Sequence, residues 1–287
     1  MAKPSLRREE NVSGDFYVDS SCIDCDTCRW MVPEVFGREN EKSNVQKQPT
    51  TEQEIRKAYH ALLSCPTQSI GSGAVSKPKE VMEDFPILIA ENVYHLGFHS
   101  DLSFGAAAYL IVRERGNVMI DSPRYSKALA KRIDSLDGIQ HLFLTHSDDV
   151  ADHEKFHQHF QCERWIHKGD AEGDLTQLEH VFGDEVTMID DECEIIKTLG
   201  HTAGSCCLKY QDFLFSGDHL AWSLRLNHLY AFYNYRWDWE KTIQSMERLA
   251  NYHFKWVLPG HGRRFYGDVN DTQEQMKLCL AWMKKQA

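Results

Sequence analysis

The chain has 287 residues, of which 42% are hydrophobic and 26% charged, an ordinary composition for a globular protein of about two domains. No stretch approaches the roughly 20 apolar residues of a membrane span, and residues 1–15 lack the apolar core of a secretory signal, so we expect a cytoplasmic protein without a membrane partner. The net charge is −11, with −1 in residues 1–80 and −10 in the remainder, which argues against nucleic acid as a partner because nucleic acids bind basic surfaces.

Four of the nine cysteines lie in the first 65 residues. Two-residue gaps separate Cys22, Cys25 and Cys28, and Cys65 is followed by Pro66. Disulfides are unusual in a chain that we expect to be intracellular. Two-residue gaps allow successive thiolates to bind one inorganic cluster, and a distant fourth cysteine completes the set of ligands. Tetrahedral zinc with four thiolates is the alternative.

The sequence around these cysteines resembles single-cluster bacterial ferredoxins. Residues 19–36, DSSCIDCDTCRWMVPEVF, are similar to their cluster loop, and residues 65–70, CPTQSI, are similar to their closing segment. A two-cluster ferredoxin carries another cysteine before the proline, where this chain has Val32. The resemblance therefore implies a ferredoxin-like domain with one 4Fe-4S cluster bound by Cys22, Cys25, Cys28 and Cys65.

A helix is predicted over residues 51–64, because Thr51 is a good N-terminal cap and apolar residues recur at helical spacing. Glycines at 71 and 73 and the Lys-Pro-Lys run at 77–79 indicate a linker, so we place the domain boundary near residue 80, between domains 1–80 and 81–287. Further along, strands are expected at residues 86–90, 93–98, 106–113 and 118–120, and helices at 126–135, 152–160 and 241–252. Asp121 directly follows the fourth of these strands.

The stretch from Leu142 to His153 changes abruptly from an apolar run, typical of a buried strand, to histidine and aspartate. Five possible metal donors fall within eight residues: His146, Asp148, Asp149, Asp152 and His153. Imidazole with carboxylate is a ligand set for zinc or non-haem iron, and a bound dication would keep three neighbouring carboxylates ionised. The alternative is a helix N-terminus, where aspartates offset the macrodipole.

Three later segments repeat this design, each placing a histidine or aspartate just past a strand-like run. They are residues 200–205 (GHTAGS), 213–218 (FLFSGD) and 256–262 (WVLPGHG). In this order, with the T-H-x-D and D-H of the earlier stretch, the motifs resemble the metallo-beta-lactamase superfamily over residues 84–287. The whole chain would then be an α+β protein, in which a ferredoxin-like N-terminal domain precedes a metallo-beta-lactamase-like αββα sandwich.

The resemblance implies one or two divalent ions, zinc or iron, at one edge of the sandwich. His146, Asp148 and His201 would bind one ion, Asp218 would bridge, and the other ion would be bound by Asp152, His153 and His261. The chain departs from the family pattern H-x-H-x-D-H, because position 148 is Asp and the Asp-His pair arrives two residues late. Asp149 is an alternative second-position ligand. A carboxylate there is similar to the flavodiiron branch, whose metal is iron.

Residues 219–240 are rich in aromatic side chains, with Arg225 and Arg236 among them. They form either a pocket wall with an arginine facing an anionic substrate or a packing layer against the final helices. We expect a metal-dependent hydrolase of a small-molecule substrate, in which Asp152 orients a metal-bound hydroxide. One alternative is an oxidoreductase with a di-iron site that receives electrons from the 4Fe-4S cluster and from a redox partner protein. Another is a redox-responsive binding or sensor protein.

Overall fold

The computed structural model describes residues 2–73 and 78–286, so positions 74–77 of the predicted linker lie outside it. Contacts divide the chain into two compact units that do not follow chain order. The first is Met1–Val118, Pro123–Ile139 and Ala151–Phe160, and the second is Met119–Ser122, Gln140–Val150 and Gln161–Ala287. The predicted boundary near residue 80 stays a prediction.

The cysteine-rich part of the first unit is built from short elements around a small core. Its elements are η1 (Pro4–Leu6), β1 (Phe16–Val18), α1 (Thr27–Met31), β2 (Phe36–Glu39), β3 (Lys42–Val45), α2 (Glu52–Ser64) and β4 (Ile70–Ser72). Strand β1 pairs antiparallel with β4, and β2 pairs antiparallel with β3. Phe16 and Tyr59 pack edge to face in the core, with ring centroids 5.0 Å apart.

Helix α2 confirms the predicted helix and its cap. The Thr51 side chain accepts a hydrogen bond from Glu54 N, and the Glu54 carboxylate accepts one from Thr51 N, which is a complete capping box. Ala58, Tyr59 and Ala61 form the buried face. The helix ends at Cys65, whose φ of −61° and ψ of 121° lie outside the helical region. The capping box and Cys65 therefore stand at opposite ends of the same helix.

The rest of the first unit contains three antiparallel strands and three helices. They are α3 (Pro78–Met82), β5 (Ile87–Ala90), β6 (Val93–His95), β7 (Tyr109–Ile111), α4 (Lys127–Asp134) and α5 (His153–Phe160). The strand predicted at 93–98 ends early, because Gly97 and Phe98 have φ of 62° and 49°, outside the β region. The strand predicted at 106–113 is likewise shorter.

Four strands of the second unit follow one another in the order β8, β9, β10, β11. Their bounds are β8 (Val118–Ile120), β9 (His141–Phe143), β10 (Glu163–His167) and β11 (His180–Phe182). Strands β9, β10 and β11 are parallel, so their carboxyl ends lie at the same edge. Two 3-10 turns accompany them, η2 (Ser147–Asp149) directly after β9 and η3 (Gly173–Gln177) before β11.

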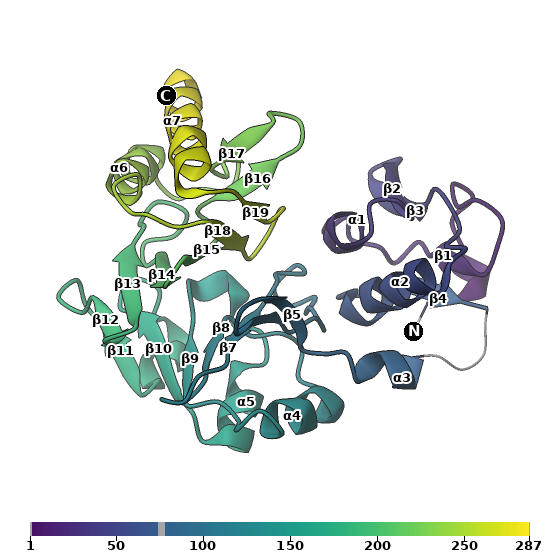
Figure 1. The fold of residues 1–287 in the computed structure, drawn as a ribbon, viewed down its shortest axis with the longest axis horizontal. Coiled ribbons are helices and arrows are strands. Elements are labelled where there is room, and N and C mark those ends of the chain that lie inside the picture. The colour runs from purple at the N-terminus through teal and green to yellow at the C-terminus, as the bar shows by residue number, and fades with distance from the viewer. Residues whose placement is uncertain (1, 74–77, 287) are drawn as a thin grey trace. The chain divides into compact units, whose positions relative to one another are not determined.

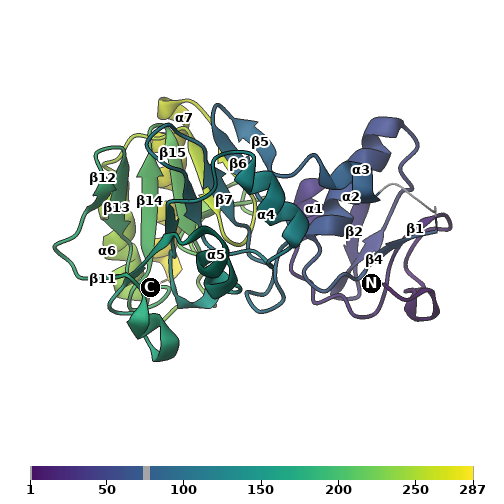
Figure 2. The same ribbon diagram turned by 90° about the horizontal axis from the view of Figure 1, so that it is seen from below.

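The other sheet of the second unit has the order β12, β13, β14, β15, β18, β19, and Figure 2 shows β12 to β15 side by side. The bounds are β12 (Met188–Asp190), β13 (Cys193–Lys197), β14 (Cys206–Tyr210), β15 (Phe213–Gly217), β18 (Trp256–Pro259) and β19 (Phe265–Tyr266). Strands β15 and β18 are parallel, whereas the other pairs are antiparallel. A separate hairpin joins β16 (Ala221–Ser223) to β17 (His228–Tyr230).

Helices α6 (Trp239–Leu249) and α7 (Val269–Gln286) cover one face of this sheet (Figure 1). Met246 and Met276 from the helices pack in one core with Leu214 and Val257 from the strands. Helix α6 begins before the predicted residue 241 because Asp238 caps it, accepting a hydrogen bond from Lys241 N at 3.0 Å. Of the helices in the described ranges, none has both the length and the apolar character needed to cross a bilayer.

Candidate metal centres

The four N-terminal cysteines surround one hollow in the first unit. Cys22, Cys25, Cys28 and Cys65 all line it, together with neighbours such as Thr27 and Ser69. Four thiolates are the ligand set of a 4Fe-4S cluster and also of tetrahedral zinc.

Hydrogen-bond donors point at the cysteine sulfurs. Burial raises the pKa of Cys25 to about 11, while the hydroxyl and the backbone N–H of Thr27 act in the opposite direction. Ser69 N lies 3.3 Å from Cys65 Sγ, and Asp24 N lies 3.5 Å from Cys22 Sγ. Such donors stabilise the thiolate, which is the form that binds iron. The cysteines, the hollow and these donors together fit an anionic cluster.

Two aspartates between the cysteines determine the backbone conformation of the loop that carries three of them. Asp24 and Asp26 have φ of 63° and 66°, a left-handed conformation that aspartate tolerates better than most residues. The buried Arg29 guanidinium lies 2.6 Å from a carboxylate oxygen of each. Arg29 thus holds both turns, and the turns direct successive cysteines toward the same hollow.

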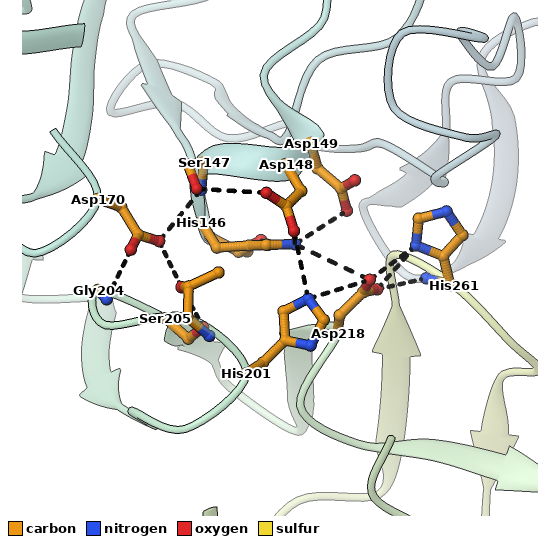
Figure 3. A network of polar contacts seen from close by, with 12 residues as sticks. His146, Ser147, Asp148, Asp149, Asp170, His201, Gly204, Ser205, Asp218 and His261 are labelled. Carbon is orange, nitrogen blue, oxygen red and sulfur yellow. Dashed lines mark hydrogen bonds and ion pairs between the residues drawn. The ribbon is translucent and has the colours of Figure 1, made fainter. Parts of the chain in front are cut away.

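The predicted histidine and aspartate ligands come together in the second unit. The buried His146 follows β9, and its Nε2 lies 3.8 Å from Asp218 Oδ2 and 3.9 Å from Asp149 Oδ2. His201, beyond β13, places Nε2 3.7 Å from Asp218 Oδ2 (Figure 3). These distances exceed a hydrogen bond. They suit two ligands of one ion, because each ligand bond is about 2.0–2.1 Å long.

Two groups of possible ligand atoms are found among the described residues, and in each all atoms lie within 4.8 Å of one another. The first is His146, His201 and Asp218, and the second is Asp149, Asp218 and His261. Asp218 belongs to both groups, as expected of a bridging carboxylate. Asp148 Oδ2 lies 3.6 Å from His201 Nε2 and 4.0 Å from His146 Nε2, beside the first group.

The electrostatics of these side chains favour a cation. Asp149 is 1% exposed, and within the described structure neither its carboxylate oxygens nor His146 Nε2 has a hydrogen-bond partner. Burial, and then the Asp218 charge, raise the pKa of Asp149 well above its usual range. Burial alone would also raise the pKa of Asp218, but His261 lowers it. Buried ligand atoms that have no hydrogen-bond partner, such as those of Asp149 and His146, fit one or two divalent ions.

Asp121 and Thr145 orient His146. The buried Asp121 Oδ1 accepts hydrogen bonds from Thr145 N at 2.8 Å and from the Thr145 hydroxyl at 3.0 Å, and Thr145 Oγ1 lies 2.9 Å from His146 Nδ1. Burial raises the pKa of Asp121 to about 7 in spite of these hydrogen bonds. Asp121 is therefore placed to orient His146, since fixing one ring nitrogen directs the other toward the site.

Asp170, beyond β10, links two ligand loops and was not predicted from the sequence. Its Oδ2 accepts hydrogen bonds from Ser147 N at 3.1 Å and from the Thr202 hydroxyl, and its Oδ1 accepts one from Gly204 N at 2.7 Å (Figure 3). Ser147 follows His146, and Thr202 follows His201. Like the ligands, Asp170 lies just past a strand-like run, but the groups that donate hydrogen bonds to it cannot be read from the sequence.

Two sequence profiles match the chain. The profile of the 4Fe-4S single cluster domain of Ferredoxin I matches residues 18–72, and that of the metallo-beta-lactamase superfamily matches residues 104–261, more than half of the chain. The chain belongs to the metallo-beta-lactamase superfamily. The matches fall on either side of residue 80 and confirm that an iron–sulfur domain precedes the superfamily domain. A search of curated proteins finds no match.

Several solved structures, among them two metallo-beta-lactamases, share the superfamily fold with this chain. DIM-1 exposed to ceftazidime has a TM-score of 0.53 and 15% identity, covering 70% of this chain and 96% of its own. VMB-1 has a TM-score of 0.50 and 20% identity, with coverage of 68% and 95%, and BLEG-1, of the B3 class, has a TM-score of 0.50 and 18% identity, with coverage of 63% and 95%. At these identities the likeness confirms the predicted fold and nothing further.

Asp152 and His153, which correspond to the Asp-His pair of the superfamily pattern, lie in the first unit at the start of α5. Asp152 accepts a hydrogen bond from Tyr125 N at 2.7 Å and pairs with Lys155 at 2.8 Å. Neither Asp152 nor His153 belongs to the two ligand groups of the described residues, whereas Asp149 does. The catalytic role of Asp152 and the ligand roles of both residues stay predictions.

In the aromatic segment, residues 219–240, some side chains form a packing layer and others are exposed. The ring centroids of Tyr233 and Trp239 are 4.9 Å apart, and the Arg236 guanidinium lies 3.7 Å from the Tyr233 centroid, as in a packing layer. Tyr235 and Trp237 are instead 72% and 54% exposed. Trp237 N donates hydrogen bonds to the carbonyls of residues 200 and 201, so this exposed part adjoins the His201 loop of the superfamily domain.

Proposed function

We propose that this superfamily member is a metal-dependent hydrolase with an iron–sulfur domain. The observation that carries the proposal is the membership of Asp218 in both ligand groups, the arrangement required for two adjacent ions. Such ions, when bound, lower the pKa of a water molecule toward neutrality and polarise a carbonyl or phosphoryl oxygen. The substrates that this chemistry serves are esters, thioesters and phosphoesters.

The five ligand residues would bind the two ions as follows. His146 and His201 would bind one ion, Asp149 and His261 the other, and Asp218 would hold both. His146 and Asp149 are buried, which removes competing water and strengthens the charge interactions around them. The exposed rings of Tyr235 and Trp237 beside the His201 loop offer a flat apolar surface for the part of the substrate that does not react.

The test begins with the full chain purified anaerobically. Iron, zinc and acid-labile sulfide are counted, about four irons and four sulfides being assigned to the cluster. We expect about two further zinc ions per chain, and hydrolysis of at least one of an aryl ester, an acyl thioester or an aryl phosphodiester. Asp218→Asn should lose the further metal and fall to the background rate. Zinc-loaded protein that hydrolyses none of the three classes would overturn the proposal.

A second candidate is an oxidoreductase that takes electrons from the cluster. It is favoured by the first ligand group, because two histidines and one carboxylate are the ligand set of many non-haem iron oxygenases. The ferredoxin match supports it, since a one-electron carrier has an evident use beside an iron site. Further iron in place of zinc, with oxygen consumption that depends on a reduced cluster, would favour this candidate. A chain that binds no further metal would exclude both enzymes and leave a redox-responsive binding protein.

A further inference from the structure

The exposed end of the aromatic segment is fixed to the loop that carries His201. Trp237 N donates hydrogen bonds to the carbonyl oxygens of Gly200 and His201, both at 2.9 Å, and Asp238 N donates to the Gly200 carbonyl oxygen. Gly200 has a φ of 140°, and a Cβ there would lie 2.5 Å from Thr242 N, so the start of α6 packs directly on this loop. Trp237 and the first turn of α6 therefore have fixed positions beside a ligand of the first group.

A lysine ammonium lies over the exposed ring of Trp237. Lys241 belongs to the first turn of α6, and its Nζ is 4.2 Å from the ring centroid of Trp237, which is 54% exposed. A cation at this distance from an indole is attracted by the electron density of the ring face. Within residues 2–73 and 78–286, no carboxylate forms an ion pair with this ammonium. Its charge is therefore free to pair with a ligand.

The two arginines of the aromatic segment differ from Lys241. The Arg236 guanidinium lies 3.7 Å from the ring centroid of Tyr233 and 5.6 Å from that of Trp239, and it donates to the Tyr233 carbonyl oxygen. Its charge is thus engaged inside the packing layer. Arg225 is exposed in the turn between β16 and β17, and in the described structure it lies over no aromatic ring. Lys241 alone among these three cations combines an exposed ring with an unpaired charge.

The charge of the surrounding domain gives this single cation its importance. Residues 81–287 have a net charge of −10, so an anionic ligand is repelled by the domain as a whole and needs a local positive group. A flat apolar ring can stack on the exposed part of Trp237 while an anionic substituent pairs with Lys241. Tyr235, which is 72% exposed, adds further aromatic surface two residues earlier.

We propose that Trp237 and Lys241 form a subsite for a flat apolar ring that carries one anionic substituent. For the reaction itself the inference rests on the proposed hydrolase function, since the subsite would bind the part of the substrate that does not react. The substrate class then narrows to esters, thioesters or phosphoesters in which one side of the bond bears an anionic ring. Trp237 and Lys241 determine this specificity and take no part in breaking the bond.

Binding is tested apart from catalysis with two probes that contain no bond to hydrolyse, naphthalene-2-sulfonate and the neutral methyl 2-naphthyl sulfone. In isothermal titration calorimetry of the full chain at low salt, the sulfonate should bind about fivefold more tightly, the upper range for an exposed charge pair. Lys241→Met keeps an unbranched side chain over the ring and should make the two affinities equal. Equal affinities in the unaltered chain, or a preference that survives in Lys241→Met, would overturn the proposal.

Three further measurements locate the two parts of the ligand. Trp237→Leu removes the indole face and should weaken both probes several-fold, and unchanged affinities would contradict the subsite. Arg225→Gln is the matched control and should keep the preference, whereas loss of the preference there would place the anion at the hairpin. Removal of the further metal with a chelator, with the cluster irons counted before and after, should also keep the preference. Its loss would mean that the metal ions bind the sulfonate.

Hydrolysis then connects the subsite to the reaction. 6-Sulfo-2-naphthyl acetate should have a KM about fivefold below that of 2-naphthyl acetate at similar kcat, because the charge pair is the same in the ground state and the transition state. Lys241→Met should remove the difference, and equal KM values in the unaltered chain would overturn the substrate assignment. A preference for the sulfonate probe without hydrolysis of any of the three substrate classes would overturn the proposed function and still support the subsite.

Discussion

The cysteine hollow and the histidine–aspartate site are assembled from the chain in different ways. Three of the four cysteines lie within seven residues, and the fourth ends a single helix. The other site collects its donors from strand ends between residues 146 and 261, in both sheets of the second unit. One site forms from local turns, whereas the other exists only after distant segments have met.

The two sites also differ in what their donors do without metal. The backbone N–H groups of Thr27 and Ser69 donate hydrogen bonds to cysteine sulfurs. Asp149 and the Nε2 of His146, among the described residues, are buried without hydrogen-bond partners. Metal binding to the histidine–aspartate site should therefore stabilise the folded protein, because it offsets the free-energy cost of burying these polar groups without partners.

The largest expected effect is loss of the cluster in Cys65→Ser. Removing one of four thiolates should abolish a full count of four irons and four sulfides. If the two sites assemble independently, the variant should keep the metal of the histidine–aspartate site. Cys162→Ser, at a buried cysteine outside the hollow, is the matched control and should retain the cluster. Loss of both metals in Cys65→Ser would show that the sites are not independent.

Next comes the contrast between Asp218→Asn and Asp149→Asn. Asp218 belongs to both ligand groups, so its replacement should remove all metal beyond the cluster, whereas Asp149→Asn should remove only one ion. Metal per chain, measured by mass spectrometry of the elements, gives the answer. Asp212→Asn, an exposed aspartate paired with Lys255, should change nothing. Equal losses in the first two variants would mean that the ions are held only as a pair.

A smaller effect is expected from Asp170→Asn. The amide cannot accept from both loops, because its nitrogen would face a backbone N–H of Ser147 or Gly204. Residues that orient ligands typically contribute 10–100-fold to metal affinity. We expect a loss of that order at the His146–His201–Asp218 group, and a changed visible spectrum of the cobalt-substituted protein. Asp184→Asn, at an exposed aspartate that lies near His167, Lys168 and Lys197, should leave both unaltered.

The smallest effect concerns the helix that ends at Cys65. Thr51→Ala removes the capping box of α2 and should cost about 1 kcal/mol of unfolding free energy, read from urea denaturation of the cluster-containing protein. Hydrogen bonds from the N–H groups of Thr50 and Thr51 lower the pKa of Glu54 to about 2. The stability that the ionised Glu54 carboxylate adds through these hydrogen bonds is therefore complete above the unfolded pKa of about 4.3, and it is lost as the pH falls toward 2. Gln53→Ala, exposed on the same turn, should have little effect.

Features encoded by a few neighbouring residues could be predicted from the sequence. The spacing of Cys22, Cys25 and Cys28 predicts a cluster. His201, Asp218 and His261 were predicted as ligands because each comes after a strand-like run. The ligand next to His146 was harder to predict, because it depends on the path of the chain after β9. The 3-10 turn at Ser147–Asp149 buries Asp149, while Asp152 lies beyond the turn.

Asp170 escaped prediction for a different physical reason. Two of its partners are backbone N–H groups, which every non-proline residue carries, so no residue type records their presence. The strand end at residue 98 was placed too late for a related reason. Single residues with positive φ, such as Phe98, stop a strand without changing its apolar pattern.

The shared carboxylate of Asp218 has a thermodynamic consequence. Because one side chain serves both ligand groups, the affinities for two ions are linked, and the factor by which the first ion changes binding of the second equals the factor by which the second changes binding of the first. A titration would then report a coupling free energy rather than two separate dissociation constants. The supply of one metal in the cell would therefore affect the occupancy of both positions. In a protein loaded with two different metals, the occupancies would depend on the order of loading only until metal exchange reached equilibrium.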